Sequence, residues 1–133
     1  MSLLEPERFW SESLDRRLDA VRNIRRLDRD VALSGEPPGP ALAAALSTHL
    51  AGLDPEQDLG TDAFGPWHRF QSEFLGVKVF DGTALEAHAK RLAALDGAAA
   101  ANALALLRDV ADLAEDSAHR LRHGLLRYDP DAW

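Results

Sequence analysis

The sequence predicts an all-α protein, a mostly antiparallel bundle of four to five helices with long first and last helices. From about Ala98 to Tyr128 the chain has no proline, and its leucines recur at three- and four-residue steps, the spacing that places side chains on one helical face. A second long stretch, from Pro6 to a break at Ser34, has the same periodicity. Only Val77 to Phe80 has the character of a strand, so we expect the other helices to pack around the two long ones.

Length and composition favour one cytoplasmic domain. With 133 residues the chain has the size of a single domain, and we expect residues 1–133 to form one helical bundle. No apolar stretch is long enough to span a membrane, and the N-terminus lacks the basic start and apolar core of a secretory signal. The absence of cysteine excludes disulfides, thiolate metal sites and a cysteine nucleophile. The abundance of arginine and alanine is typical of a GC-rich bacterial genome.

The formal net charge of −7 argues against general nucleic-acid binding, which usually requires a basic face. Residues 1–33 hold seven acids and seven arginines, so the excess of negative charge falls entirely on the rest of the chain. Any basic patch must therefore lie on the first helix. Gripping a nucleic-acid backbone through that patch is the weakest of the functions considered.

The first helix is expected to begin at Pro6, because proline is tolerated in a first turn and Glu5 and Glu7 suit the positive end of the helix dipole. Two apolar stripes, rotated relative to one another, predict a bend or a change of packing partner near Ala20 to Asn23. The segment Ser34 to Pro40 should end the helix, because its prolines and glycines interrupt helical hydrogen bonding. The stripes are Trp10, Leu14, Leu18 and Val21, and then Ala20, Ile24, Leu27 and Val31.

The middle of the chain predicts two further helices joined by a loop. A short apolar helix is expected from Ala41 to Leu53, followed by a mostly irregular segment from Asp54 to Gly65. The third helix, from about Pro66 to Leu75, should insert three aromatic rings into the core. These rings belong to Trp67, Phe70 and Phe74.

The capping-box spacing of Thr83 and Glu86 predicts the start of a fourth helix, which runs to Leu95. Asp96 and Gly97 form a tight connector, so this helix and the last one should pack as an antiparallel hairpin. Val77 to Phe80 could extend the third helix or form an extended turn.

One polar surface is predicted on the first helix, where four arginines project from the side opposite the second apolar stripe. Planar guanidinium groups at that spacing can grip phosphates or carboxylates through paired hydrogen bonds. The alternative is a solvated face whose arginines pair with neighbouring aspartates, each exposed pair contributing at most about 1 kcal/mol. This arginine face consists of Arg22, Arg25, Arg26 and Arg29, and the neighbouring acids are Asp19, Asp28 and Asp30.

A second polar surface is predicted on the last helix, roughly half a turn away from its leucines. This stripe could bind a metal, contact a basic partner surface such as the arginine face of a second copy, or simply keep the helix soluble. It consists of Asp112, Asp116, His119 and His123, and the opposite, buried face is expected to hold Leu106, Leu107, Val110, Leu113 and Leu121.

Histidines define a metal-binding alternative. His119 and His123 are four residues apart, so one helical face can offer both imidazoles to one metal ion. His49 and His88 lie on or beside apolar stripes and should point at least partly inward. His49 together with the His119-x-x-x-His123 pair resembles the pattern of DinB-type four-helix bundles, which implies a divalent metal held by these three histidines. The leucine stripe departs from that pattern, because it places His119 and His123 away from the core.

The sequence therefore predicts a small interaction or accessory protein that presents helix faces to a protein partner or to its own second copy. No glycine-rich phosphate loop, serine nucleophile motif or paired catalytic carboxylates occur, so we expect neither enzyme activity nor a cofactor. The two apolar stripes of the first helix favour a homodimer. The alternative is a metal-dependent helical-bundle enzyme that uses His49, His119 and His123.

Overall fold

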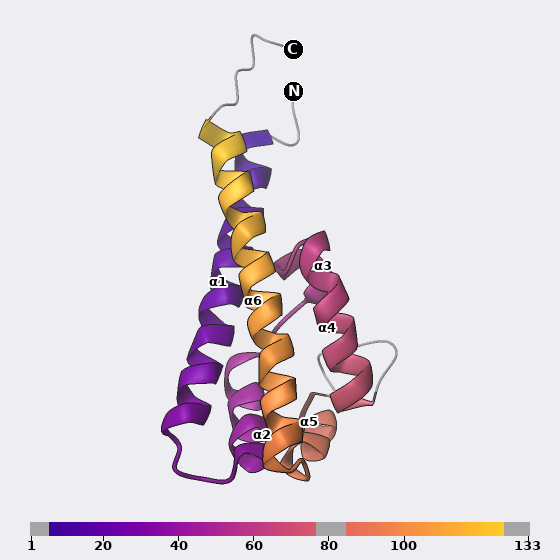
Figure 1. Cartoon of the computed structure of the whole chain (residues 1–133). Coiled ribbons are helices and arrows are strands. Elements are labelled where there is room, and N and C mark those ends of the chain that lie inside the picture. Colours follow the sequence, from indigo (N-terminus) through magenta and orange to yellow (C-terminus); the bar gives the residue numbers. More distant parts are fainter. Residues whose placement is uncertain (1–5, 77–84, 127–133) are drawn as a thin grey trace.

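Two long helices form the frame of the molecule. The computed structural model describes residues 6–76 and 85–126, and within these residues the chain forms helices and turns with no strand. Helix α1 (Pro6–Leu33) and helix α6 (Gly97–Leu126) lie side by side and run antiparallel (Figure 1). This arrangement confirms the predicted all-α bundle with long first and last helices. None of the described helices is both long and apolar enough to cross a membrane.

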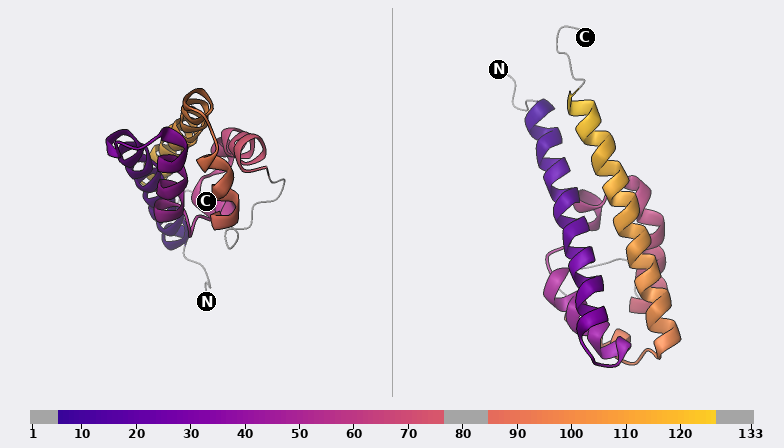
Figure 2. Two further views of the ribbon diagram at one scale, coloured as in Figure 1. Left: turned by 90° about the horizontal axis from the view of Figure 1, so that it is seen from below. Right: turned by 60° about the vertical axis from the view of Figure 1, so that its left-hand side comes forward.

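Shorter helices pack around the end of this pair where α1 finishes and α6 begins (Figures 1 and 2). They are α2 (Pro38–His49), α3 (Pro55–Asp58), the 3-10 turn η1 (Thr61–Ala63), α4 (Phe64–Phe70), its π-helical continuation η2 (Gln71–Leu75) and α5 (Leu85–Ala93). Helix α2 packs against α1 and α5, whereas α4 packs against α6.

Helix α1 is uninterrupted and ends at the predicted break. The helix continues without a break through Ala20 to Asn23. The helix that packs against α1 changes along its length. Arg16 lies beside Asp58 of α3, whereas Asp30 contacts His49 of α2. The second of the two predicted outcomes, a change of partner, therefore accounts for the two apolar stripes.

Two predicted helix boundaries are wrong. Helix α2 starts at Pro38 and not at Ala41, because prolines in a first turn need no hydrogen-bond donor. It also ends at His49 and not at Leu53. The predicted loop from Asp54 to Gly65 holds the single turns α3 and η1, together with the start of α4.

The core lies where α1, α2, α4 and α6 meet. Trp67 and Phe70 are completely buried and Phe74 is partly buried, which confirms the predicted aromatic contribution. The ring centroids of Trp67 and Phe70 are 5.6 Å apart, within the range of favourable aromatic contacts. Leu113 corrects the predicted buried face of α6, because it is 36% exposed. It lines an open hollow together with Gly65 and Pro66 of α4.

The predicted hairpin between the fourth helix and α6 is wrong, because α5 packs mainly on α2 and η2. Gly39 makes this packing close: a Cβ atom there would lie 2.6 Å from the carbonyl oxygen of Leu95 and 2.8 Å from that of Leu92. Asp96 instead caps α6, since its Oδ1 accepts a hydrogen bond from the Ala99 amide at 2.8 Å. Val77 to Phe80, the capping residue Thr83 and the side chain of His88 lie outside the described part of the chain.

Among the described residues, α1 and α6 alone form the opposite end of the molecule. The start of α1 and the end of α6 extend beyond the shorter helices (Figures 1 and 2). We assign residues 6–15 and 121–126 to this segment, because Arg16 still lies beside Asp58 of α3 and Arg120 still contacts Asp62 of η1. We call this two-helix segment the arm, and the remainder the packed end. Leu14 and Leu121 are only partly buried in the arm, whereas Ile24 and Leu27 are buried at the packed end.

Candidate functional site

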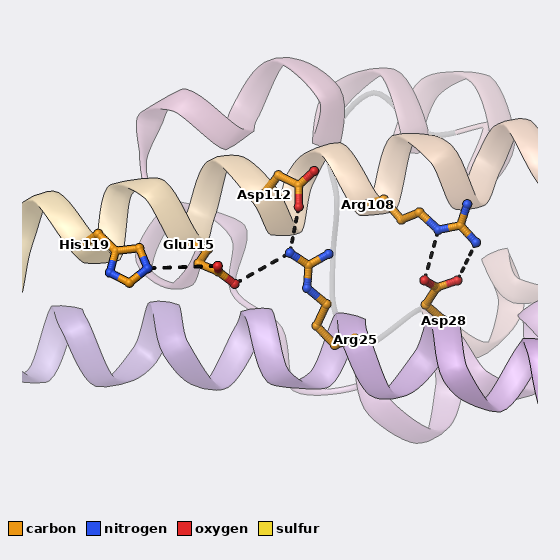
Figure 3. A network of polar contacts seen from close by, with 6 residues as sticks. All are labelled: Arg25, Asp28, Arg108, Asp112, Glu115 and His119. Carbon is orange, nitrogen blue, oxygen red and sulfur yellow. Dashed lines mark hydrogen bonds and ion pairs between the residues drawn. The ribbon is translucent and has the colours of Figure 1, made fainter.

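A row of charged side chains crosses between α1 and α6 (Figure 3). Arg25 Nη2 donates a hydrogen bond to Asp112 Oδ1 at 2.7 Å and lies 3.6 Å from Glu115 Oε2. The hydrogen bond to Asp112, together with the charges of both acids, raises the pKa of Arg25 against the opposing effect of its burial. One residue of the predicted arginine face and one of the predicted α6 stripe are therefore paired within a single chain.

A second contact in this row is bidentate. Arg108 donates from Nε to Asp28 Oδ2 at 3.0 Å and from Nη2 to Asp28 Oδ1 at 2.8 Å. His119 Nε2 lies 4.0 Å from Glu115 Oε1 at the other end. We call these six residues the α1–α6 seam. Because most of these side chains are exposed, each pair contributes about 1 kcal/mol or less to stability.

The remaining residues of the arginine face have mixed environments. All four arginines are exposed. Arg22 Nη1 donates to Asp19 Oδ1 at 2.9 Å, the local pairing expected of a solvated face. Arg26 and Arg29 make no hydrogen bond or ion pair with another described residue. Only these two guanidinium groups of the face are therefore available to a partner without breaking a contact.

The α6 stripe is exposed over its whole length, as its offset from the leucines predicts. Asp116 Oδ2 lies 3.7 Å from Arg120 Nη2, and Arg120 also donates a hydrogen bond to Asp62 in η1. Asp112 and Asp116 therefore both have arginine neighbours in their own chain. Sequence reasoning missed Arg108, Glu115 and Arg120, although each lies four residues from a stripe residue, the spacing at which helical side chains meet.

The three candidate metal ligands do not form one group. His49 is partly buried, and its Nε2 lies 2.6 Å from Asp30 Oδ2 on α1. His119 and His123 are exposed on α6. In the described part of the chain, no three or more His, Cys, Asp or Glu side chains come together in a way that could hold a metal ion.

An unpaired guanidinium lies at the base of the arm. Arg17 Nε and Nη1 are buried without a hydrogen-bond partner. Burial lowers the pKa of Arg17, and the nearby charge of Arg120 lowers it further. Gly60 lies against this group, because a Cβ atom there would be 2.9 Å from Arg17 Nε and 2.8 Å from Ser117 Oγ. The sequence signal was the position of Arg17 between Leu14 and Val21, on the first apolar stripe.

A cleft of about 220 Å³ lies near the same level, between α1, the end of α2 and α3. Its polar lining residues are Arg16, Asp19, Asn23, His49 and Asp58. From the sequence, His49 was named only as a candidate metal ligand and Asp19 only as a neighbour of the arginine face. The cleft itself was not predicted, because it depends on the packing of α3 against α1.

No protein-family model, curated protein or solved structure matches this chain. Functional inference therefore depends on the arm, the α1–α6 seam and the cleft themselves.

Proposed function

We propose that this chain is a small cytoplasmic interaction protein that works as a homodimer, with the arm as its dimer interface. The observation that carries the proposal is the partial burial of Leu14 and Leu121 where α1 and α6 have no third helix beside them. Two amphipathic helices cover only one side of each other, and a second pair is the usual way to cover the rest. Two arms packed together supply four helices.

Unpaired charges in the arm favour a second copy of this chain as the partner that packs against the arm. Arg25 on α1 lies opposite Asp112 on α6. Because the two helices are antiparallel, equal steps along both helices lead from this pair to Asp15 and Arg122, which therefore lie at the same height along the helix pair. Both side chains are exposed, and neither makes a hydrogen bond or ion pair with another described residue. Two-fold symmetry makes an interface self-complementary, so Asp15 of each copy can pair with Arg122 of the other.

The contacts within the chain argue against two other interfaces. Arg25 and Asp112 neutralise each other, which disfavours docking of the α6 stripe on the arginine face of a second copy. Arg22 is also paired locally, so only Arg26 and Arg29 of the arginine face remain to bind a nucleic-acid backbone without breaking a contact with a described residue. That number is small against the net charge of −7.

Light scattering over about a hundredfold range of concentration tests the proposal. We expect a mass of twice the 14.5 kDa chain at the upper end of the range. Leu14→Glu and Leu121→Glu should each give monomers that keep a helical circular-dichroism spectrum. Leu33→Glu is the matched control, because Leu33 is 76% exposed at the other end of α1. A wild-type monomer throughout the range would contradict the proposal.

A charge exchange tests the orientation of the two copies. Asp15→Arg and Arg122→Asp should each weaken the dimer, and the double variant should restore it. Loss of the dimer in the double variant would exclude this pairing. Elemental analysis of untagged protein distinguishes the metal-dependent alternative, which stoichiometric zinc together with a monomeric mass would favour.

A further inference from the structure

The cleft beside α3 presents polar side chains of both charges over an apolar floor. Ala20, Leu50 and Leu53 are buried and form the floor. The volume of 220 Å³ is below the range of about 300–1,000 Å³ that is typical of sites for drug-sized ligands. A ligand that fits must therefore be a small metabolite.

The α1 wall of the cleft offers groups that bind a carboxylate. Arg16, Asp19 and Asn23 follow at three- and four-residue spacing and so share one face of the helix. Neither Arg16 nor Asn23 makes a hydrogen bond or ion pair with another described side chain, and Asn23 is partly buried. A guanidinium and an amide N–H can together donate to both oxygens of one carboxylate.

The opposite wall adds a carboxylate that binds a cation. Asp58 Oδ2 accepts a hydrogen bond from the Asp54 amide at 2.9 Å, which leaves Oδ1 without a partner among the described residues. Burial raises the pKa of Asp58, although the hydrogen bond from the Asp54 amide and the nearby charge of Arg16 act in the opposite direction. Asp19 also lines the cleft, although its Oδ1 accepts from Arg22. His49 is held through Nε2 by Asp30, which leaves Nδ1 as its remaining polar atom.

The mixture of charges selects the class of ligand. A simple anion would meet Asp19 and Asp58, and a simple cation would meet Arg16, so each would gain one favourable contact and one repulsive contact. A zwitterion satisfies both sets of groups. We propose that the cleft binds a free amino acid or a zwitterion of similar size, with its carboxylate on Arg16 and Asn23 and its ammonium on Asp58 and Asp19.

Titrations followed by amide NMR signals test this site, with L-glutamine, acetate and ethylamine as probes. L-Glutamine should shift the amides of Ala20, Asn23 and Gly52 saturably at millimolar concentration. Acetate and ethylamine each carry only one of the two charges and should bind at least about tenfold more weakly. Equal responses to all three probes, or no saturable response to L-glutamine at these amides, would overturn the proposal.

Matched variants locate the binding to the cleft. Asn23→Ala and Arg16→Gln should each weaken L-glutamine binding by about tenfold, the usual effect of losing one hydrogen bond to a charged group. Asn102→Ala and Arg29→Gln are the controls, because both residues are exposed and make no hydrogen bond or ion pair with another described residue. Unchanged affinity in the Asn23 and Arg16 variants would contradict the assignment. None of these residues belongs to the arm, so the dimer mass of the same samples reports separately on the proposed function.

Discussion

The packed end and the arm are built from the same two helices, yet they bury their apolar side chains to different degrees. Ile24 and Leu27 are at most 1% exposed, because α2 and α6 both pack on that part of α1. Leu14 lies on the same uninterrupted helix, in the first of its two apolar stripes, but it stays partly exposed. Periodicity therefore predicts which side of a helix is apolar, whereas the number of neighbouring helices sets how deeply that side is buried.

The largest expected difference is between two leucine truncations on α1. Leu27→Ala should lower the free energy of unfolding by about 2–5 kcal/mol, because it leaves a cavity in a filled core. Leu14→Ala should cost less than about half as much in dilute protein. Urea denaturation at two protein concentrations measures both changes. If the arm is a dimer interface, the cost of Leu14→Ala rises with concentration and that of Leu27→Ala does not.

In the packed end, α2 approaches α5 and the residues after it closely at Gly39. Gly39→Ala should destabilise the protein by about 1–3 kcal/mol, because the new methyl group would meet the Leu92 and Leu95 carbonyl oxygens, which belong to the backbone. Gly65→Ala is the control, since no atom lies within 4 Å of the added carbon. That change should be neutral or stabilise α4 by up to about 1 kcal/mol. Similar thermal midpoints for the two variants would show that α2 can move away from α5.

Arg17 lies at the boundary of the two regions and should be a source of instability. Replacing it by methionine removes two buried nitrogen atoms whose hydrogens have no acceptor, so Arg17→Met should raise the free energy of unfolding by about 1 kcal/mol. Arg16→Met changes the exposed neighbour and should stay within about 0.5 kcal/mol of wild type. Differential scanning calorimetry measures both, and a lower melting temperature for Arg17→Met would mean that this guanidinium stabilises the fold.

The smallest expected effect concerns pH, at the cleft beside this boundary. Burial raises the pKa of Asp58 above its ordinary value of 3.8, so the folded protein holds this proton more tightly than the unfolded chain. The resulting stability is present below pH 3.8 and is lost as the pH rises through the raised pKa. Asp58→Asn should therefore match wild type in acid and exceed it by less than about 1 kcal/mol near neutral pH, after allowance for solvent screening. A constant difference between the two proteins at all pH values would contradict this assignment.

Local spacing was sufficient for the long helices and for most of the core. The three- and four-residue repeats predicted α1, α6 and the burial of Trp67 and Phe70, because neighbours on a helical face are determined by the helix itself. The prolines and glycines after Ser34 marked the end of α1 for the same local reason. The start of α2 was misplaced because proline ends one helix and begins another equally well.

Contacts between distant residues were decided only by the tertiary structure. The pairing of Arg25 with Asp112 and of His49 with Asp30 depends on which helices lie side by side and on how far they are shifted along their axes. No local sequence repeat specifies either. The same holds for α5, which packs on α2 because Gly39 permits the approach, although the short connector at Asp96 pointed to α6. The sequence by itself thus determined where helices form and which faces are apolar. Tertiary packing alone decided which charges are neutralised, why Arg17 is left unpaired and where the cleft opens, because these depend on the relative placement of whole helices.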